Sequence, residues 1–308
     1  MKFSLRELEV FVAVARTGSV SRAAGVVALS QSAASTALGE LERQFDCRLF
    51  ERVGKSLRIN TLGEQLLPKA VELLDRAAEI EALLEGRTGL GSLRIGATLT
   101  IGNYLATLIV ADFLQRHGEA KIQLSVHNTA TIVEQVAGYE LDLGLIEGAC
   151  RHPELEVQPW VDDELVVFAA PDHPLTRRRK VSLDVLMRER WILREAGSGT
   201  REVFEQALRP HGLEPRIRLE LEHTEAIKRA VESGLGLGCI SRLALREAFR
   251  RGSLAPIRTP ELNLGRRFQF VWHKGKYQTA TLREFLAACR AMSAGARRRD
   301  LIDLPYIL

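Results

Sequence analysis

Residues 4–63 read SLRELEVFVAVARTGSVSRAAGVVALSQSAASTALGELERQFDCRLFERVGKSLRINTLG, and the pattern of this stretch decides the N-terminal fold. Ser4 and Glu7 match an S-x-x-E capping box, so a helix is expected to begin after Ser4 and to end at Gly18. Ser19 can cap a second helix, and a third helix follows after a short turn. The buried positions predicted for the third helix are Ala34, Leu38, Leu41 and Phe45.

Two short strands are predicted after the third helix, at residues 49–52 and 57–59, with Gly54 between them. Three helices and a hairpin form a winged helix-turn-helix, in which one helix enters the major groove of DNA. The third helix carries small or amide-bearing residues off its buried side, and such side chains pair with bases or phosphates. A polar helix surface also occurs without DNA, but basic residues on the hairpin favour DNA binding, because a wing reaches neighbouring phosphates. The candidate DNA-binding residues are Gln31, Ser32, Ser35, Thr36, Arg52, Lys55 and Arg58.

A long helix is predicted next, from a capping box at Thr61 and Glu64 to about Glu85. Its apolar residues recur at spacings of four and three, which is the heptad pattern of a coiled-coil seam. The natural partner of such a seam is a second copy of the chain, and packing against the helix's own domain is the alternative. Glycines within residues 86–91 predict a hinge and a domain boundary. The seam residues are Leu66, Ala70, Leu73, Ala77, Ile80 and Leu84.

From Ser92 onward, short apolar strands alternate with helical stretches, which predicts βαβ units and a largely parallel sheet. The helical stretches lie near residues 101–116, 131–138, 201–211 and 225–233. The predicted strands are residues 93–96, 122–126, 141–146, 165–169, 217–221 and 236–240.

Several strand-to-helix turns of this second half carry hydroxyl or amide side chains. Ligands bind at this edge of an α/β sheet, and exposed N–H groups at helix starts bind anions. Any one of these residues is most simply an ordinary helix cap, but two or three together indicate a site for a small anion. The candidate effector-binding residues from this pattern are Thr98, Thr100, Asn128, Thr129, Ser198, Thr200 and Thr224.

The stretch that contains FVAVARTGSVSRAAG and CRLFER resembles the DNA-binding domain of LysR-type transcriptional regulators, and the resemblance continues along nearly the whole chain. It implies DNA contacts from four residues of the third helix and from Arg52 of the wing. Ser32 and Thr36 stand where proline and Arg or Gln are frequent in that family, and Asp46 replaces a common glycine.

The second half resembles the effector-binding domain of the same family, a pair of α/β lobes like those of periplasmic binding proteins, with a ligand cleft. ELDLGLIEG and WILREAGSGTREVFE look most like its CysL-type branch, which is associated with sulfur assimilation and cysteine synthesis. His223 replaces a small residue of that branch and joins the candidate effector-binding residues. Three domains are expected: residues 1–62 bind DNA, residues 63–91 form the linker helix and hinge, and residues 92–308 bind the effector. Within the effector-binding domain, lobe I is expected at about 92–161 and 267–295, and lobe II at about 162–266.

The composition excludes several other classes of protein. Hydrophobic residues make up 46% and charged residues 27% of the 308 residues, which is typical of globular proteins. No apolar run is long enough for a membrane span, and the charged N-terminus does not resemble a signal peptide. The four scattered cysteines have no metal-ligand spacing, and residues 197–201 lack the second glycine of a G-x-S-x-G nucleophile motif. The net charge of +4 does not by itself indicate a nucleic-acid partner.

Together these features predict a cytoplasmic, ligand-responsive transcription factor without catalytic residues, a metal site or a cofactor. Its expected partners are operator DNA, a small anion linked to sulfur metabolism, and further copies of the chain. The copies form a homodimer through the linker helix and, as the resemblance implies, a homotetramer; a membrane is not expected. A small carboxylate is the alternative effector. The rival classes are a solute-binding protein, which the winged helix opposes, and an α/β enzyme, for which no nucleophile–base or metal constellation appears.

Overall fold

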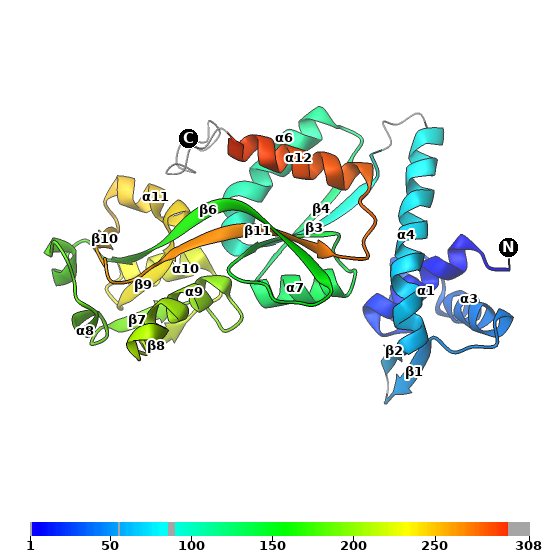
Figure 1. Ribbon diagram of the computed structural model, residues 1–308, viewed down its shortest axis with the longest axis horizontal. Coiled ribbons are helices and arrows are strands. Elements are labelled where there is room, and N and C mark those ends of the chain that lie inside the picture. The colour runs from blue at the N-terminus through cyan, green and yellow to red at the C-terminus, as the bar shows by residue number, and fades with distance from the viewer. Residues whose placement is uncertain (1, 55, 86–89, 295–308) are drawn as a thin grey trace.

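In the computed structural model, which describes residues 2–54, 56–85 and 90–294, a small helical domain lies at one end and two α/β lobes at the other (Figure 1). The long helix α4 stands between them. The N-terminal elements are α1 (Leu5–Thr17), α2 (Val20–Val26), α3 (Gln31–Gln44), β1 (Phe50–Val53), β2 (Ser56–Ile59) and α4 (Thr61–Leu84).

The winged helix-turn-helix prediction is confirmed. The Ser4 hydroxyl accepts a hydrogen bond from the Glu7 N–H at 3.2 Å, and the Glu7 carboxylate accepts one from the Ser4 N–H at 2.7 Å, so the capping box starts α1. Gly18 ends α1 in the left-handed conformation, with φ of 63°. The Ser19 hydroxyl caps α2. Buried side chains of α1, α2 and α3 then form one core with the first half of α4.

Two local predictions in this domain were wrong. Phe45 is the C-cap of α3 and is 49% exposed, because the helix ends there and its ring turns out toward Phe3. The long helix α4 is capped by Asn60, whose side-chain oxygen accepts a hydrogen bond from the Gly63 N–H at 2.9 Å; Thr61 is the first helical residue.

Lobe I is a parallel three-stranded sheet with helices packed against it. Strand β3 lies between β4 and β5 and runs parallel to both. The sheet and α6 and α12 share one hydrophobic core, and a second cluster lies beneath α7. Its elements are β3 (Ser92–Thr98), α5 (Leu99–Ile101), the π-helix η1 (Gly102–Ala106), α6 (Thr107–Arg116), β4 (Lys121–His127), α7 (Thr129–Ala137), β5 (Leu143–Glu147) and α12 (Ala280–Ala294).

Lobe II repeats this arrangement around a parallel trio in which β7 lies between β8 and β9. Apolar side chains cover both faces of this trio. Its elements are η2 (Pro174–Arg177), α8 (Leu183–Leu186), β7 (Arg190–Leu193), α9 (Gly199–Leu208), η3 (Arg209–His211), β8 (Arg216–Glu220), α10 (Thr224–Glu232), β9 (Leu237–Ser241), α11 (Arg242–Arg251) and β10 (Ala255–Ile257).

Two long strands, β6 (Leu155–Ala169) and β11 (Gly265–His273), cross from one lobe to the other (Figure 1). They pair antiparallel with each other, β11 with β5 of lobe I and β6 with β9 of lobe II. The sheet is therefore parallel within each lobe and antiparallel where the chain crosses. The expected pair of α/β lobes is confirmed, and all six predicted strands overlap observed strands.

The predicted hinge lies mostly outside the described residues, since only Leu90 and Gly91 of its C-terminal end are described. Among the residues that are described, no helix is long and apolar enough to cross a membrane.

Candidate DNA interface and effector cleft

The four candidate DNA-binding residues of α3 share one exposed side of the helix. Gln31, Ser32, Ser35 and Thr36 are all exposed, whereas the opposite side of α3 packs into the domain core. Three of the four side chains are short, so the helix backbone can approach the floor of a DNA groove, and Gln31 carries an amide that can pair with a base.

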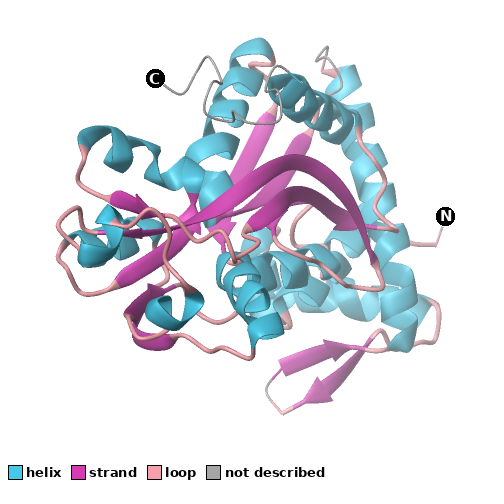
Figure 2. Cartoon of the chain, turned by 60° about the vertical axis from the view of Figure 1, so that its left-hand side comes forward, coloured by secondary structure: helices cyan, strands magenta, loops and turns pink. Residues whose placement is uncertain are grey.

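The hairpin of β1 and β2 projects from the body of the molecule (Figure 2). Arg52 and Arg58 are both exposed. Arg58 pairs with Glu51, and Arg52 with Leu57; since paired residues share a face, the two arginines project from opposite faces of the hairpin. A hairpin that enters a groove edge-on could thus place one guanidinium near each wall. The third candidate, Lys55, lies outside the described residues.

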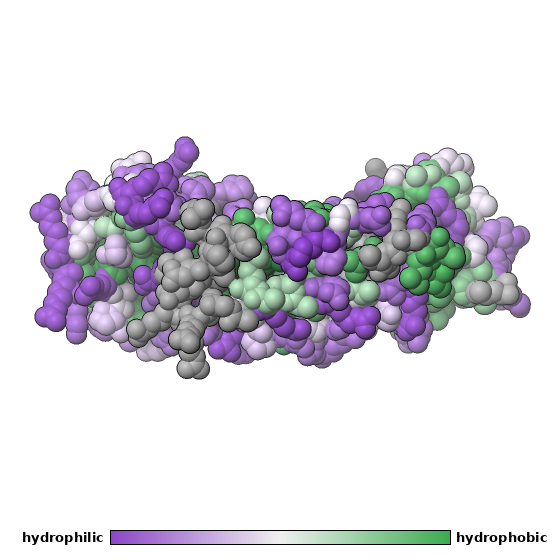
Figure 3. All heavy atoms as spheres, turned by 90° about the horizontal axis from the view of Figure 1, so that it is seen from above, coloured by the Kyte–Doolittle hydropathy of each residue, from purple (hydrophilic) through white to green (hydrophobic). Residues whose placement is uncertain are grey.

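The predicted seam of α4 divides into two halves. Leu66 and Ala70 pack within the core of their own domain, as the alternative interpretation expected. Farther along, Leu73, Ile80 and Leu84 are 38%, 58% and 83% exposed. Hydrophobic residues gather at the C-terminal end of α4, which is the end nearer the viewer in Figure 3. Only the second half of the seam is therefore free to contact another chain.

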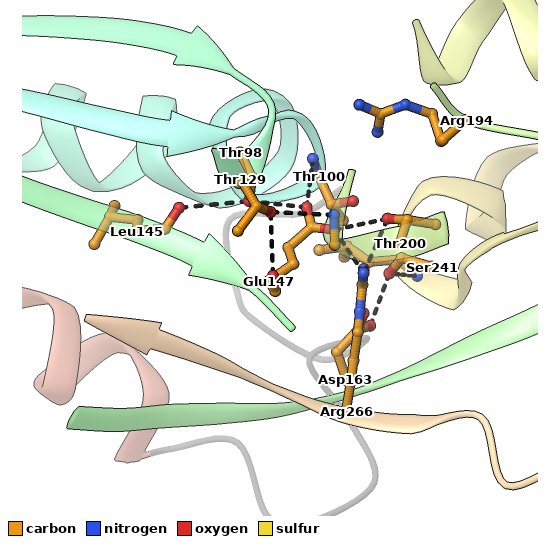
Figure 4. Close-up of polar contacts among 12 residues, drawn as sticks. Thr98, Thr100, Thr129, Leu145, Glu147, Asp163, Arg194, Thr200, Ser241 and Arg266 are labelled. Carbon is orange, nitrogen blue, oxygen red and sulfur yellow. Dashed lines mark hydrogen bonds and ion pairs between the residues drawn. The ribbon is translucent and has the colours of Figure 1, made fainter. Parts of the chain in front are cut away.

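Three candidate effector-binding residues converge on one internal carboxylate, Glu147, at the end of β5 (Figure 4). One oxygen of Glu147 accepts hydrogen bonds from the Thr98 hydroxyl at 3.0 Å and the Thr100 N–H at 2.9 Å. The other oxygen accepts one from the Thr200 hydroxyl at 2.8 Å. Thr98 and Thr100 belong to lobe I and Thr200 to lobe II, so both lobes contribute donors to this oxyanion site.

Arg266 of β11 completes the cluster. It lies 2.6 Å from Glu147 and 2.6 Å from Asp163 of β6, and all three side chains are buried. Arg266 also donates to the Thr200 hydroxyl at 2.9 Å, and Ser241 donates to Asp163 at 2.7 Å. The Nη2 of Arg266 has no hydrogen-bond partner among the described residues.

The charge state of Glu147 follows from these contacts. Burial would raise the pKa of this carboxyl, but the Arg266 guanidinium and the hydrogen bonds from Thr100 and Thr200 outweigh burial and hold the pKa below its ordinary value. Glu147 is therefore ionised, and the hydroxyls around it are held as donors.

Thr129 forms a second bridge between the lobes. Its hydroxyl donates to the backbone oxygen of Glu147 and accepts from the Gly199 N–H, both at 3.2 Å. A Cβ at Gly199 would lie 2.1 Å from the backbone oxygen of Glu147, so only glycine lets the start of α9 come this close to the end of β5.

Two of the four remaining candidates line an open cavity of about 430 Å³ between the lobes. Asn128 and His223 line it, together with Glu195 and Glu222. Of the predicted helix caps in this half of the chain, Asn128 does cap α7, by accepting from the Thr131 N–H at 3.0 Å. Ser198 and Thr224 are buried at the starts of α9 and α10. Ser198 makes no side-chain cap, and neither does Thr98.

The sequence interpretation missed Glu147, Asp163 and Arg266. A carboxylate is not expected among residues chosen as anion ligands, and Arg266 lies 103 residues beyond Asp163 in the chain. The available signal was Glu147 at the end of the apolar strand LDLGLIE. No cluster suited to a metal ion occurs among the described residues.

Comparison with known proteins agrees with both halves of this geometry. Residues 5–64 match the family described as bacterial regulatory helix-turn-helix protein, lysR family, and residues 86–294 match the LysR substrate binding domain. The uncharacterized HTH-type transcriptional regulator YeiE of Escherichia coli K12 is 42% identical over 289 residues, which cover 94% of this chain and 98% of YeiE. The regulator CysL of Bacillus subtilis is 30% identical over 266 residues, or 86% of this chain and 89% of CysL.

Solved structures show the same fold. Full-length OxyR from Pseudomonas aeruginosa covers 94% of both chains at 22% identity, with a TM-score of 0.71. The regulatory domain of CcmR from Synechocystis PCC6803, solved in complex with 2-PG, is 30% identical; the match covers 65% of this chain and 96% of that domain, with a TM-score of 0.61. Proteins of this family are DNA-binding regulators that respond to effectors and are not enzymes. The chain therefore belongs to the LysR family of bacterial transcriptional regulators.

Proposed function

We propose that this regulator binds operator DNA as a dimer through α3 and the wing, and that a compact anion bound between the lobes controls it. The observation that carries the second part is the oxyanion site around Glu147. Two hydroxyls, one backbone N–H and a buried guanidinium already hold a carboxylate there. These are the donors that an oxyanion needs.

Glu147 acts in this proposal as an internal competitor of the effector. Thr98, Thr100 and Thr200 already bind its carboxylate, so an effector anion reaches these donors only when that carboxylate moves aside. Glu147 is fixed to β5, whereas the effector anion is not. Replacement of the Glu147 carboxylate by the effector therefore changes the populations of the lobe arrangements.

Sulfite, sulfate or thiosulfate is the proposed effector class, because these anions suit the site and the sequence resembles the CysL-type branch. A small carboxylate is the second candidate, and one observation favours it: the site already binds a carboxylate. A small-molecule effector also agrees with the similar CcmR domain, which was solved in complex with 2-PG. In this proposal the regulator acts in the cytoplasm, where its DNA is, as a homodimer that forms a homotetramer through its effector domains.

Thr200→Val and Thr98→Val should each weaken anion binding by about 1–3 kcal/mol, because each removes a hydroxyl donor and keeps the shape of the side chain. Glu147→Gln should strengthen binding, since the internal competitor loses its charge. Titration calorimetry with sulfite, sulfate, thiosulfate, O-acetylserine and small carboxylates measures both effects. Thr176→Val is the matched control, because its hydroxyl donates to backbone oxygens elsewhere in lobe II. Unchanged affinity in both threonine variants, or binding only of neutral ligands, contradicts the anion site.

Arg52→Ala should weaken operator binding and reduce the slope of log K against log salt by about one, if this side chain neutralises one phosphate. Gln31→Ala should instead change the preferred base sequence. Gel shifts with the DNA upstream of the gene, at roughly 50 to 200 mM salt, separate the two effects. Arg250→Ala removes another exposed arginine, from lobe II, and serves as the control. An Arg52→Ala protein with unchanged affinity and salt slope would refute the wing assignment.

A further inference from the structure

We propose that a buried ion-pair latch fixes α4, and with it the DNA-binding domain, to lobe I. We propose further that the paired strands β5 and β11 connect this latch to the effector cleft. The second statement rests on the function proposed above; the first stands without it.

The centre of the latch is Lys276, in the loop between β11 and α12, with a side chain that is only 3% exposed. Its ammonium contacts the Asp75 carboxylate of α4 and lies 2.9 Å from the Asp142 carboxylate of lobe I. Asp142 in turn accepts from the Arg94 guanidinium at 2.7 Å and 3.1 Å and from the Arg94 N–H at 2.8 Å. A residue of the linker helix is thus part of an ion-pair network that otherwise belongs to lobe I.

A second contact lies one helical turn farther along α4. Glu79 accepts a hydrogen bond from the Ala280 N–H at 2.8 Å and one from the Tyr277 hydroxyl at 3.3 Å. Ala280 is the first residue of α12, and a carboxylate at a helix N-terminus is favoured by the helix dipole. The Arg76 guanidinium covers the Tyr277 ring at 4.4 Å from its centre. The linker helix therefore caps a helix of lobe I.

The winged helix contributes to the same interface. Burial and the nearby Arg94 lower the pKa of Arg16 in α1 to about 10, while Asp142 and Asp75 act in the opposite direction. Tyr139 of lobe I packs into the core of the winged-helix domain, and its hydroxyl lies 2.5 Å from His273 Nδ1. Most of these contacts are polar, and water can solvate the same groups once the surfaces separate. An interface of this kind is suited to opening and closing.

Strands β5 and β11 carry charged pairs at both ends of their antiparallel ladder. Glu147 ends β5 opposite Phe268, close to Arg266, at the cleft. Asp142 precedes β5, and Lys276 follows β11, at the latch. Because a hydrogen-bonded ladder moves as a unit, displacement of the Glu147–Arg266 pair shifts the Asp142–Lys276 pair relative to α4. Occupancy of the cleft thereby biases the orientation of the DNA-binding domain.

Asp75→Lys tests the latch, because it places a second ammonium beside Lys276 and leaves a helix-forming residue in α4. Hydrogen exchange of the full chain should show amides of residues 274–284 exchanging about ten-fold faster, while peptides of α3 and β7 remain unchanged. Asp75→Asn should give a smaller change in the same direction. Glu81→Lys, the same charge reversal at an exposed position of α4, is the control. Equal exchange at 274–284 in the Asp75→Lys and Glu81→Lys proteins would overturn the latch.

Glu147→Gln tests the connection without any effector. If the ladder transmits the change, exchange at residues 274–284 should increase several-fold, and the exposed control Glu164→Gln should leave it unchanged. A Glu147→Gln protein that changes only cleft peptides would overturn the connection. Failure of the proposed function would give a different result. Calorimetry would then detect no anion binding to the wild-type protein, while the hydrogen-exchange changes at residues 274–284 would be unaffected.

Discussion

Ile80→Asp is expected to abolish dimerisation through α4 and to leave each chain folded. Ile80 is 58% exposed in the single chain, so an aspartate there does not disturb the chain's own core. In a dimer that pairs the second half of the seam, two carboxylates would face each other without water. That arrangement costs on the order of several kcal/mol. Sedimentation should show monomers, and gel shifts should show loss of tight operator binding, because two winged helices no longer act together.

Ala78→Asp is the matched control, because Ala78 is also exposed but lies on nearly the opposite side of the helix from Ile80. It should leave the dimer intact. An intact dimer in the Ile80→Asp protein, with α4 still helical by circular dichroism, would refute the seam. Loss of the dimer in the Ala78→Asp protein instead would move the interface to the other side of α4.

The sequence predicted the N-terminal domain in detail because its signals are local. The Ser4–Glu7 capping box, the stop at Gly18 and the polar side of α3 each depend on residues within a few turns of one another. The heptad pattern was local too, but it could not show that Leu66 and Ala70 are used inside the domain while Ile80 is not. That division depends on where the three short helices pack against α4.

The effector cleft was predicted less completely, because its centre depends on long-range pairing. The hydroxyls of Thr98 and Thr200 were found from the strand-to-helix pattern, yet their partner is a carboxylate of the chain itself. Nothing local to Glu147 shows that Arg266, in a strand close to the C-terminal end of the fold, lies 2.6 Å away. Polar residues at strand ends predict where a site lies, whereas the pairing of β5 with β11 determines what fills it.

Arg266→Met is expected to destabilise the effector domain by about 3–5 kcal/mol, the largest effect of any single change considered for this domain. The substitution leaves Glu147 and Asp163 buried together without the cation that both contact. The chain's three tryptophans, Trp160, Trp191 and Trp272, all lie in the effector domain. Tryptophan fluorescence during urea unfolding of the full chain therefore reports on this domain directly.

The pH dependence of the free energy of unfolding distinguishes the loss of the Arg266 charge from a simple loss of packing. In the wild-type protein the pKa of Glu147 is lowered on folding, so its ionisation stabilises the fold above the unfolded pKa, and this contribution is lost as pH falls. Burial already raises the pKa of Asp163 in the wild-type protein, despite its contact with Arg266. Without Arg266, burial dominates at Glu147 as well and raises the pKa of both carboxyls, so the folded state binds more protons than the unfolded state. The difference in unfolding free energy between wild type and Arg266→Met should thus shrink as pH falls from about 8 to about 5.

Arg267→Met is the matched control, because it removes an exposed arginine paired with exposed Asp162, and it should cost no more than about 1 kcal/mol of stability. A deficit that is independent of pH, or equal in the two variants, would show that the cluster does not depend on its buried charges.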